Sequence, residues 1–297
     1  MDIMILRVAI LSLLISFQFP SAEAFLFTKP IKVSKAHKQI NKSTETALNP
    51  DSIKVFVWNI HKGNDKGFKE DFLHYGADRD IFMIQEMYEQ KKVTSTLSQM
   101  PGVRFDVGMS FRYRFKKGKP YSGTMIGSRV KPSFVGLSRS KNKEPVVLTY
   151  KVMTIGKYPI KGQENDLMIV NIHGMNITSN KAFYRQINDA INAMSGHRGP
   201  IIFAGDFNTN RQKRIDYLQR NLVQRLGFED MKFRNDRRMR SAITNLTIDF
   251  SFIRGLEVID SEVLGELKSS DHKAMYFEVA VKDDKDSVNN KAILAAQ

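Results

Sequence analysis

The sequence contains no cysteine and only one tryptophan, and its 31 acidic residues are outnumbered by 46 lysines and arginines. The absence of cysteine excludes disulfide scaffolds, thiolate metal sites and cysteine nucleophiles. Beyond its N-terminal segment the chain has no apolar run of 18 or more residues, the length that indicates a membrane-spanning helix. The net charge of +15 favours anionic partners such as nucleic acid, phospholipid headgroups or phosphorylated metabolites.

Residues 1–24 have the pattern of a secretory signal peptide. A single base, Arg7, precedes the apolar run Val8–Phe19, and the small-x-small sequence Ala22–Ala24 follows it as a cleavage site. The sequence therefore predicts export to the periplasm or the medium, with an uncleaved N-terminal membrane anchor as the alternative.

The rest of the chain predicts one α/β domain. Residues 25–50 are polar and lysine-rich and are predicted to be a linker or N-terminal arm, and residues 282–297 a flexible tail. Between 51 and 281, short runs rich in Val, Ile, Phe and Tyr alternate with helical patterns. The predicted strands are Ile53–Trp58, Ile81–Gln85, Gly123–Ser128, Val146–Ile155, Leu167–Ile172, Ile201–Ala204, Ile248–Ile253 and Ala274–Val281.

Three segments carry the spacing of amphipathic helices. The clearest is Lys181–Ser195, whose apolar residues recur on one face and whose start can be capped by Ser179 or Asn180. A second helix is predicted near Lys213–Leu226, and a weaker one over Glu89–Met100.

Polar residues follow the apolar strands in six places, where a rigid support can present them. Any one such residue is usually a turn former that bonds its own backbone. With no thiolates available, metal ligands must be hard oxygens, which suit Mg²⁺ or Mn²⁺, and Glu86 with Asp271 would suffice. The six segments are Trp58-Asn59-Ile60, Gln85-Glu86, Asn171-Ile172-His173, Gly205-Asp206-Phe207-Asn208, Ile248-Asp249-Phe250 and Ser270-Asp271-His272.

This ordered set resembles the endonuclease/exonuclease/phosphatase superfamily, which includes pancreatic-type DNases, apurinic endonucleases, neutral sphingomyelinases and inositol polyphosphate 5-phosphatases. The alternation of strands and helices alone would suggest a doubly wound sheet. The resemblance instead implies a four-layer α/β/β/α sandwich, in which two packed mixed β-sheets are flanked by helices. It also implies a phosphoester hydrolase whose substrate the shared fold does not define.

The resemblance implies a role for each matching residue. Glu86 would be the principal metal ligand, with Asn59 beside it and Asp271 contributing. His173 would stabilise the developing charge or protonate the leaving oxygen. Asn171 is assigned to substrate binding.

Four further residues would act directly on the phosphate or the water. Asp206 would orient and deprotonate the attacking water, and Asn208 would hold that water or the phosphate. His272 would contact a non-bridging oxygen, with its imidazole oriented and kept cationic by Asp249.

Two positions depart from the family pattern. His61 stands where apurinic endonucleases carry an aspartate, which argues against base-excision repair. Pancreatic-type DNases orient their counterpart of His173 with a glutamate, and no equivalent is found near Ser122–Gly123.

Basic segments bear on the choice of substrate. Phe111–Lys117 alternates aromatic and basic residues, which on a strand would make either a phosphate-tracking ribbon or a half-buried strand with a solvated basic face. The interval between the fourth and fifth motifs forms rim loops in the family, so its arginines are expected to contact substrate. The predicted substrate-binding arginines are Arg211, Arg234, Arg237 and Arg238.

Three functions compete at this point. The first is a Mg²⁺- or Mn²⁺-dependent phosphodiesterase acting as a nuclease on DNA or RNA. The second is the same chemistry on a phospholipid or an inositol phosphate, although the sequence shows no apolar aromatic insertion loop. The third is a non-catalytic nucleic-acid-binding module, which would not need the acidic and imidazole groups. No stable protein partner is implied.

Overall fold

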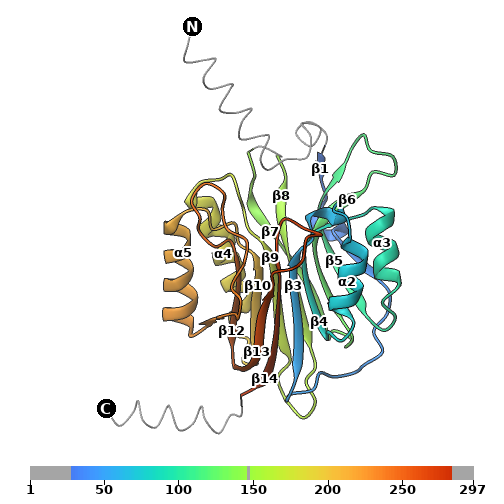
Figure 1. Cartoon of the computed structure of the whole chain (residues 1–297). Coiled ribbons are helices and arrows are strands. Elements are labelled where there is room, and N and C mark those ends of the chain that lie inside the picture. The colour runs from blue at the N-terminus through green and yellow to red at the C-terminus, as the bar shows by residue number, and fades with distance from the viewer. Residues whose placement is uncertain (1–27, 146–147, 283–297) are drawn as a thin grey trace.

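The computed structural model describes residues 28–145 and 148–282. The predicted signal peptide and residues 283–297 of the predicted tail lie outside these ranges, so both stay predictions. Two β-sheets stack face to face, and helices cover the outer face of each (Figure 1). Among the described residues, no helix combines the length and apolarity that a membrane span requires.

The first sheet has eight strands, and only β3 and β4 in it run parallel. β2 pairs with β5 beside β1, so the segment 28–40 builds the edge of this sheet. The strands in spatial order are β1 (Thr28–Pro30), β5 (Arg104–Tyr113), β6 (Tyr121–Ser128), β4 (Ile81–Tyr88), β3 (Ile53–Asn59), β14 (Ala274–Val281) and β13 (Leu256–Leu264), with β2 (His37–Ile40) on β5.

The second sheet has six strands and is also mixed, because β9 and β10 run parallel and the other pairs antiparallel. Its strands in spatial order are β11 (Glu229–Asp230), β12 (Asp249–Arg254), β10 (Ile201–Asp206), β9 (Leu167–His173), β8 (Tyr150–Tyr158) and β7 (Phe134–Lys143).

Helices pack on the outer face of each sheet. α2 (Phe68–Gly76) and α3 (Lys91–Ser98) cover the first sheet, and α4 (Asn180–Met194) and α5 (Gln212–Leu218) cover the second. Ser179 caps α4, accepting a bond from the Ala182 amide at 3.3 Å. Shorter helical segments are Val33–Lys35, His61–Gly63 and a π-helical stretch, Gln219–Gln224, that continues α5.

Alternating side chains divide the interior into three apolar layers. In β3, Val55 and Val57 face the core between the sheets, whereas Phe56 and Trp58 pack beneath α2. β10 alternates in the same way, with Ile202 and Ala204 facing inward. Because side chains alternate along a strand, a strand covered on both faces is apolar throughout. The four-layer α/β/β/α sandwich implied by the family resemblance is therefore confirmed, and the doubly wound single sheet is wrong.

Three boundary predictions need correction. The segment 28–50 is not a linker: its two strands pair with β5, and Leu48 is buried in the core between the sheets. The strand predicted over Phe111–Lys117 ends at Tyr113, where the chain turns, so no extended ribbon forms. The strand predicted to begin at Val146 begins at Tyr150; residues 146–147 lie outside the described ranges.

Candidate active site

The polar motifs meet because their strands end at the same edge of the sandwich. β3 and β4 are parallel, so Asn59 lies opposite Gln85. β10 is parallel to β9 and antiparallel to β12, which places Asp206 between His173 and Asp249. Strand pairing alone thus gathers the motif residues at one end of each sheet.

Hydrogen bonds join the two sheets at this end. The Asn59 amide Nδ2 in the first sheet donates to Asp206 Oδ2 in the second, at 3.1 Å. The Ser270 hydroxyl donates to the Asn59 carbonyl at 2.7 Å, and the Trp58 indole donates to the His272 carbonyl at 3.0 Å. The loop before β14 is therefore tied to the end of β3, which fixes His272 beside Asp206.

A strained bulge presents Glu86 to the site. The register of β4 against β6 shifts between Ile84 and Met87, and Glu86 has a φ of 54°, in the left-handed region. Burial alone would raise the pKa of its carboxyl, but nearby positive charge, led by the Lys62 ammonium at 3.8 Å and including Lys151, outweighs burial and lowers that pKa to about 2. Glu86 is therefore an ionised carboxylate on a backbone held in an unfavourable conformation, as is common at functional sites.

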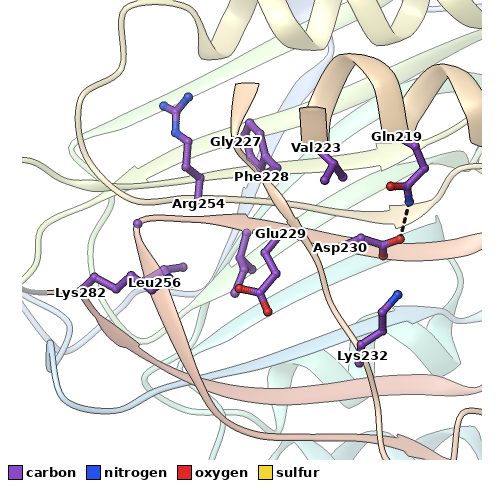
Figure 2. Close-up of a pocket in the computed structure, with 12 residues that line it drawn as sticks. Gln219, Val223, Gly227, Phe228, Glu229, Asp230, Lys232, Arg254, Leu256 and Lys282 are labelled. Carbon is purple, nitrogen blue, oxygen red and sulfur yellow. Dashed lines mark hydrogen bonds between the residues drawn. The ribbon is translucent and has the colours of Figure 1, made fainter. Parts of the chain in front are cut away.

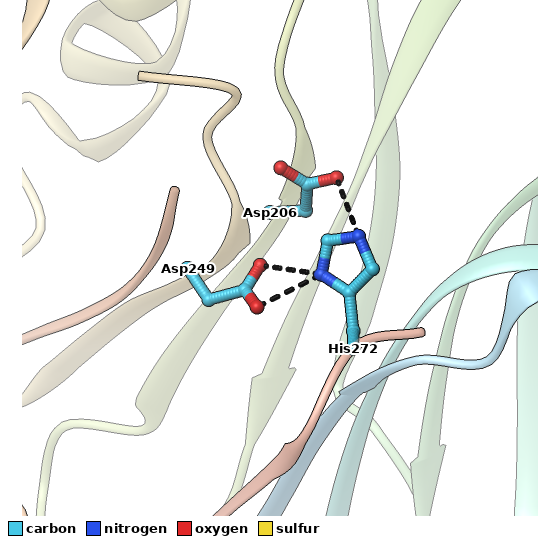
Figure 3. Close-up of side chains that lie close together, drawn as sticks. All are labelled: Asp206, Asp249 and His272. Carbon is cyan, nitrogen blue, oxygen red and sulfur yellow. Dashed lines mark hydrogen bonds and ion pairs between the residues drawn. The ribbon is translucent and has the colours of Figure 1, made fainter. Parts of the chain in front are cut away.

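His272 and Asp249 form a buried hydrogen-bonded pair (Figure 3). His272 Nδ1 lies 2.8 Å from Asp249 Oδ2, and His272 Nε2 lies 3.9 Å from Asp206 Oδ2. Burial opposes the charge on His272, but the Asp249 carboxylate outweighs it and raises the pKa of His272 to about 10. The ring is a cation at neutral pH with its Nε2–H directed at Asp206.

Asp206 lies at the centre of the group. Burial raises its pKa, and the neighbouring Asp249 carboxylate adds to this, while the His272 cation opposes it. Its Oδ1 accepts from the Asn208 amide at 2.9 Å, and its Oδ2 faces Asn59 and both histidines. A buried carboxylate with a raised pKa is suited to accept a proton from water.

Asn208 is held as rigidly as the carboxylate it contacts. Its φ is 53°, and its side-chain Nδ2 donates to the Gly174 carbonyl at 3.1 Å. Gly174 in turn lies against this segment so closely that a Cβ there would be 2.1 Å from the Phe207 carbonyl oxygen. Asn208 therefore helps position Asp206, and its contact with phosphate or water stays a prediction.

His173 has an unexpected neighbour. Its Nε2 lies 3.0 Å from Lys151 Nζ and 3.6 Å from Asp206 Oδ2. Burial and the Lys151 ammonium hold the pKa of His173 well below its usual range. The two histidines of the site thus have opposite character: His272 is a cation, and His173 is neutral.

Asp271 is the most exposed of the predicted metal ligands. Its carboxylate lies 3.9 Å from His61 Nδ1 and accepts from the Ser270 hydroxyl at 3.3 Å, and its side chain is 52% exposed. Its role as a metal ligand beside Glu86 and Asn59 stays a prediction.

The donors around Glu86 fit a hard divalent cation. The Glu86 carboxylate is ionised and makes no hydrogen bond within the described part of the chain, so its oxygens are available as ligands. Asn59 Oδ1 accepts only the His61 amide, at 3.1 Å, which leaves a second lone pair. Carboxylate and amide oxygens are the ligands that Mg²⁺ prefers.

A second group could also hold a metal ion. Asp206, Asp249 and His272 offer three ligand atoms within 4.8 Å of one another. His272 Nδ1 is engaged by Asp249, which leaves Nε2 as the ring atom open to a ligand. The described residues therefore offer two candidate groups for a cation, Glu86 with Asn59, and Asp206 with Asp249 and His272.

Asn171 is not a substrate-binding residue. Its side chain is fully buried between the sheets, where Nδ2 donates to the carbonyls of Ile84 and Met125, each at 2.9 Å. Its Oδ1 accepts from the Gln85 amide at 2.6 Å. These bonds satisfy the side chain entirely within the protein, so Asn171 fastens β9 to β4.

Arg238 is also misassigned as a substrate ligand. It is buried, donates to both Asp236 oxygens and to the Asp249 carbonyl, and so supports the start of β12. Arg234 and Arg237 are each 65% exposed and pair with acids on or after β13, and Arg211 bonds the Thr178 carbonyl. Contact of these three with substrate stays a prediction.

Sequence reasoning missed three charged residues that shape the site and misread a fourth. Lys62 and Lys151 supply positive charge next to Glu86 and His173, and Glu144 pairs with Lys151. These three belong to no motif and carry no sequence signal. Arg214 follows the fourth motif in a basic run that predicts a phosphate-attracting field, but it is buried and supports the loops instead.

Arg214 holds the loops that carry the site. It is fully buried, and its guanidinium donates to four backbone carbonyls, those of Met175, Asn176, Thr178 and Asn208, at 2.7–3.1 Å. We expect Arg214→Met to lower the free energy of unfolding by ~3 kcal/mol or more, because buried carbonyls lose their donors. Urea denaturation measures this. The control is Arg211→Met, whose guanidinium is partly exposed and whose loss should change stability by less than about 1 kcal/mol.

One pocket of the described structure lies away from the motif residues. A pocket of about 490 Å³ lies at the opposite end of the second sheet, between β11, the end of β12 and the start of β13 (Figure 2). Its lining mixes acids and bases, and Asp230 there bonds Gln219 at 2.6 Å. It contains none of the motif residues, so it does not belong to the candidate active site.

Comparisons with known proteins identify the family of this chain. The model of the Endonuclease/Exonuclease/phosphatase family matches residues 56–272. A UPF0294 protein of Yersinia pestis is 30% identical over 247 residues, covering 82% of this chain and 90% of that protein. A UPF0294 protein of Yersinia enterocolitica is 30% identical over 227 residues, covering 76% and 83%.

Solved structures share the fold. An endonuclease/exonuclease/phosphatase family protein from Leptotrichia buccalis superposes with a TM-score of 0.59 and 18% identity, over 78% of this chain and all of that one. The human Nocturnin catalytic domain gives a TM-score of 0.54 and 16% identity, over 83% of this chain and 98% of that domain. The chain belongs to the endonuclease/exonuclease/phosphatase family, whose fold and chemistry are those of phosphoester hydrolases.

Proposed function

We propose that this protein is a divalent-metal-dependent phosphodiesterase. The observation that carries the proposal is the meeting of Glu86, Asp206 and the His272–Asp249 pair at one end of two different sheets. A carboxylate free to bind a cation, a buried base and a fixed imidazolium are the groups that phosphoester hydrolysis needs.

Each residue has a defined task in this chemistry. Asp206 accepts the proton of the attacking water, because its pKa is raised and its second oxygen is fixed by Asn208. The His272 imidazolium neutralises charge on a non-bridging phosphate oxygen, and Asp249 keeps it protonated and oriented. Glu86 and Asn59 would hold a Mg²⁺ or Mn²⁺ ion, which when bound neutralises the phosphate and the leaving oxygen.

Nucleic acid is the substrate class we propose first. The chain carries a net charge of +15, and Lys62 and Lys151 add positive charge within the site itself. The positive charge of the protein attracts every phosphate of a nucleic acid that lies near its surface. A small phosphomonoester has one phosphate and is attracted only at the site. The Nocturnin structure contains a bound sulfate, which supports binding of a tetrahedral anion on this scaffold.

A phospholipid is the second candidate because of exposed apolar side chains at the site end. Of the seven large hydrophobic residues exposed in the described part of the chain, four lie on loops that leave the strands at this end. Apolar side chains beside basic ones suit a lipid interface. The four are Phe115, Leu148, Ile177 and Ile243.

A substrate panel separates these candidates. Plasmid DNA, single-stranded DNA, RNA, sphingomyelin vesicles and inositol phosphates are each incubated with the protein in Mg²⁺ and in EDTA. We expect Mg²⁺-dependent cleavage of nucleic acid, absent in EDTA and in His272→Ala. Release of phosphocholine without nucleic acid cleavage would select the lipid instead. If every substrate stays intact in Mg²⁺ and Mn²⁺, the proposed function is wrong.

A further inference from the structure

Lys151 lies inside the candidate site, although no motif includes it. It is the second residue of β8, and its amide donates to the Ser140 hydroxyl at 3.0 Å, which fixes its backbone against β7. Its side chain is only 14% exposed, yet its ammonium is 3.0 Å from His173 Nε2. A lysine this buried keeps its charge only where partners compensate for lost water.

Glu144 is the compensating partner. Its Oε2 lies 3.5 Å from Lys151 Nζ, and its Oε1 accepts the Asn176 amide at 2.7 Å. Glu144 thereby links the β7–β8 hairpin, which carries Lys151, to the loop after His173. The ammonium is consequently held in place from two sides.

The contact with His173 has a defined direction. An ammonium can only donate, so His173 Nε2 must accept with its lone pair and its proton must lie on Nδ1. Nε2 is also the ring atom that faces Asp206 and Glu86. His173 therefore directs no proton into the site, and the positive charge expected at this position is supplied by Lys151 instead.

Lys151 keeps N–H groups for a ligand. Its ammonium has three, of which His173 Nε2 accepts one at 3.0 Å, and Glu144 forms an ion pair with it at 3.5 Å. The ammonium also lowers the pKa of Glu86 and Asp206, so its field reaches both oxygens that flank the reaction centre. A phosphate between these residues would meet His272 from the loop before β14 and Lys151 from β8.

We propose that Lys151 binds a non-bridging oxygen of the scissile phosphate, and that His173 acts as the neutral acceptor that aims it. This rests on the proposed phosphodiesterase chemistry and deepens it. The arrangement replaces the carboxylate–histidine pair expected from pancreatic-type DNases with a lysine–histidine pair. Lys151 is then a catalytic residue, and Glu144 and His173 are positioning residues.

Two substitutions separate charge from packing. Lys151→Gln keeps a donor for His173 but removes the charge, and Lys151→Met removes both while filling the same space. The matched control is Lys141→Met on β7, whose side chain is 73% exposed and pairs only with Asp189 among its described neighbours. Thermal unfolding confirms that each variant folds.

Two measurements are made on the full protein in Mg²⁺. The first is kcat and KM for bis-p-nitrophenyl phosphate and for the nucleic acid cleaved best. The second is the affinity for inorganic phosphate by calorimetry. We expect both Lys151 variants to lose roughly 100- to 1,000-fold in kcat/KM and about 10-fold in phosphate affinity. Lys141→Met should match the wild type in both.

Different results test the role of Lys151 and the phosphodiesterase activity separately. If Lys151→Gln is as active as the wild type, the charge is not used and the inference is overturned while the phosphodiesterase stands. If the wild type cleaves nothing, the phosphodiesterase is wrong, and phosphate affinity alone decides whether Lys151 is an anion ligand. Equal phosphate affinity of wild type and Lys151→Gln, or no phosphate binding at all, overturns the inference.

Discussion

Glu86→Gln is expected to lower kcat by roughly 1,000-fold or more and to weaken Mg²⁺ binding, since a bound cation contributes several kcal/mol to transition-state stabilisation. The substitution keeps the shape of the side chain and removes only the charge of the carboxylate. The Lys62 ammonium, 3.8 Å from Glu86, then loses its carboxylate partner, so a divalent cation would meet its positive charge uncompensated. Steady-state kinetics at several Mg²⁺ concentrations, with Mn²⁺ affinity by calorimetry, measures both effects.

The matched control is Glu89→Gln, three residues further along the same segment. Glu89 is bonded to Lys38 at 2.7 Å and makes no contact with the motif residues among the described interactions. Its loss should leave kcat and metal affinity unchanged. The result that contradicts our assignment is specific: if Glu86→Gln binds Mn²⁺ normally and His272→Asn does not, the metal lies at Asp206, Asp249 and His272.

The buried strands could be predicted from the sequence, and the edge strands could not. β3, β9 and β10 are buried along almost their whole length, and β14 buries apolar residues at alternate positions, so the predicted bounds of all four agree with the structure within about two residues. β7 and β13 lie at sheet edges with mostly half-exposed residues, so they show no such run. β1 and β2 are short and exposed, which is why their segment resembled a linker.

The helix predicted near Lys213–Leu226 is confirmed, but its hydrogen bonding changes along its length. Residues 212–226 are helical without a break, as α5 followed by a π-helical stretch from Gln219 to Gln224. A π-helical turn shifts the bonding by one residue without disturbing the apolar spacing over so short a length. Sequence periodicity cannot report it.

The residues of the candidate site likewise fall into two groups, those that a local sequence pattern reveals and those whose role depends on the tertiary fold. Asp206, Asp249 and His272 could be identified because they adjoin buried strands in a recognisable order, Asp206 at the end of β10, Asp249 at the start of β12 and His272 just before β14. Lys151 could not, because its role depends on β8 lying beside β9, which no local pattern encodes. Asn171 was misassigned for the converse reason: it belongs to a motif, but its side chain points between the sheets and away from the site.

Asp249→Asn is expected to move the alkaline limit of activity downward by several pH units. In the wild type, Asp249 holds the pKa of His272 at about 10, so the imidazolium persists throughout the neutral range. An amide cannot supply that charge, and burial then lowers the pKa of His272 below its ordinary value. Activity at pH 8 should fall roughly 100-fold or more and recover partly on acidification. The pH profile of kcat/KM, with Asp260→Asn at an exposed pair on β13 as control, tests this.

The His272–Asp249 pair also makes the free energy of unfolding depend on pH. The folded-state pKa of His272 lies above its unfolded value of about 6.5, so the folded state binds the proton more tightly. The stabilisation is complete below about pH 6.5 and is lost progressively as the pH rises to about 10. Urea unfolding at pH 6, 8 and 10 should show this decline in the wild type and not in Asp249→Asn. A decline of equal size in both proteins would mean that His272 does not carry its charge through Asp249, and the imidazolium would have to be removed from the proposed chemistry.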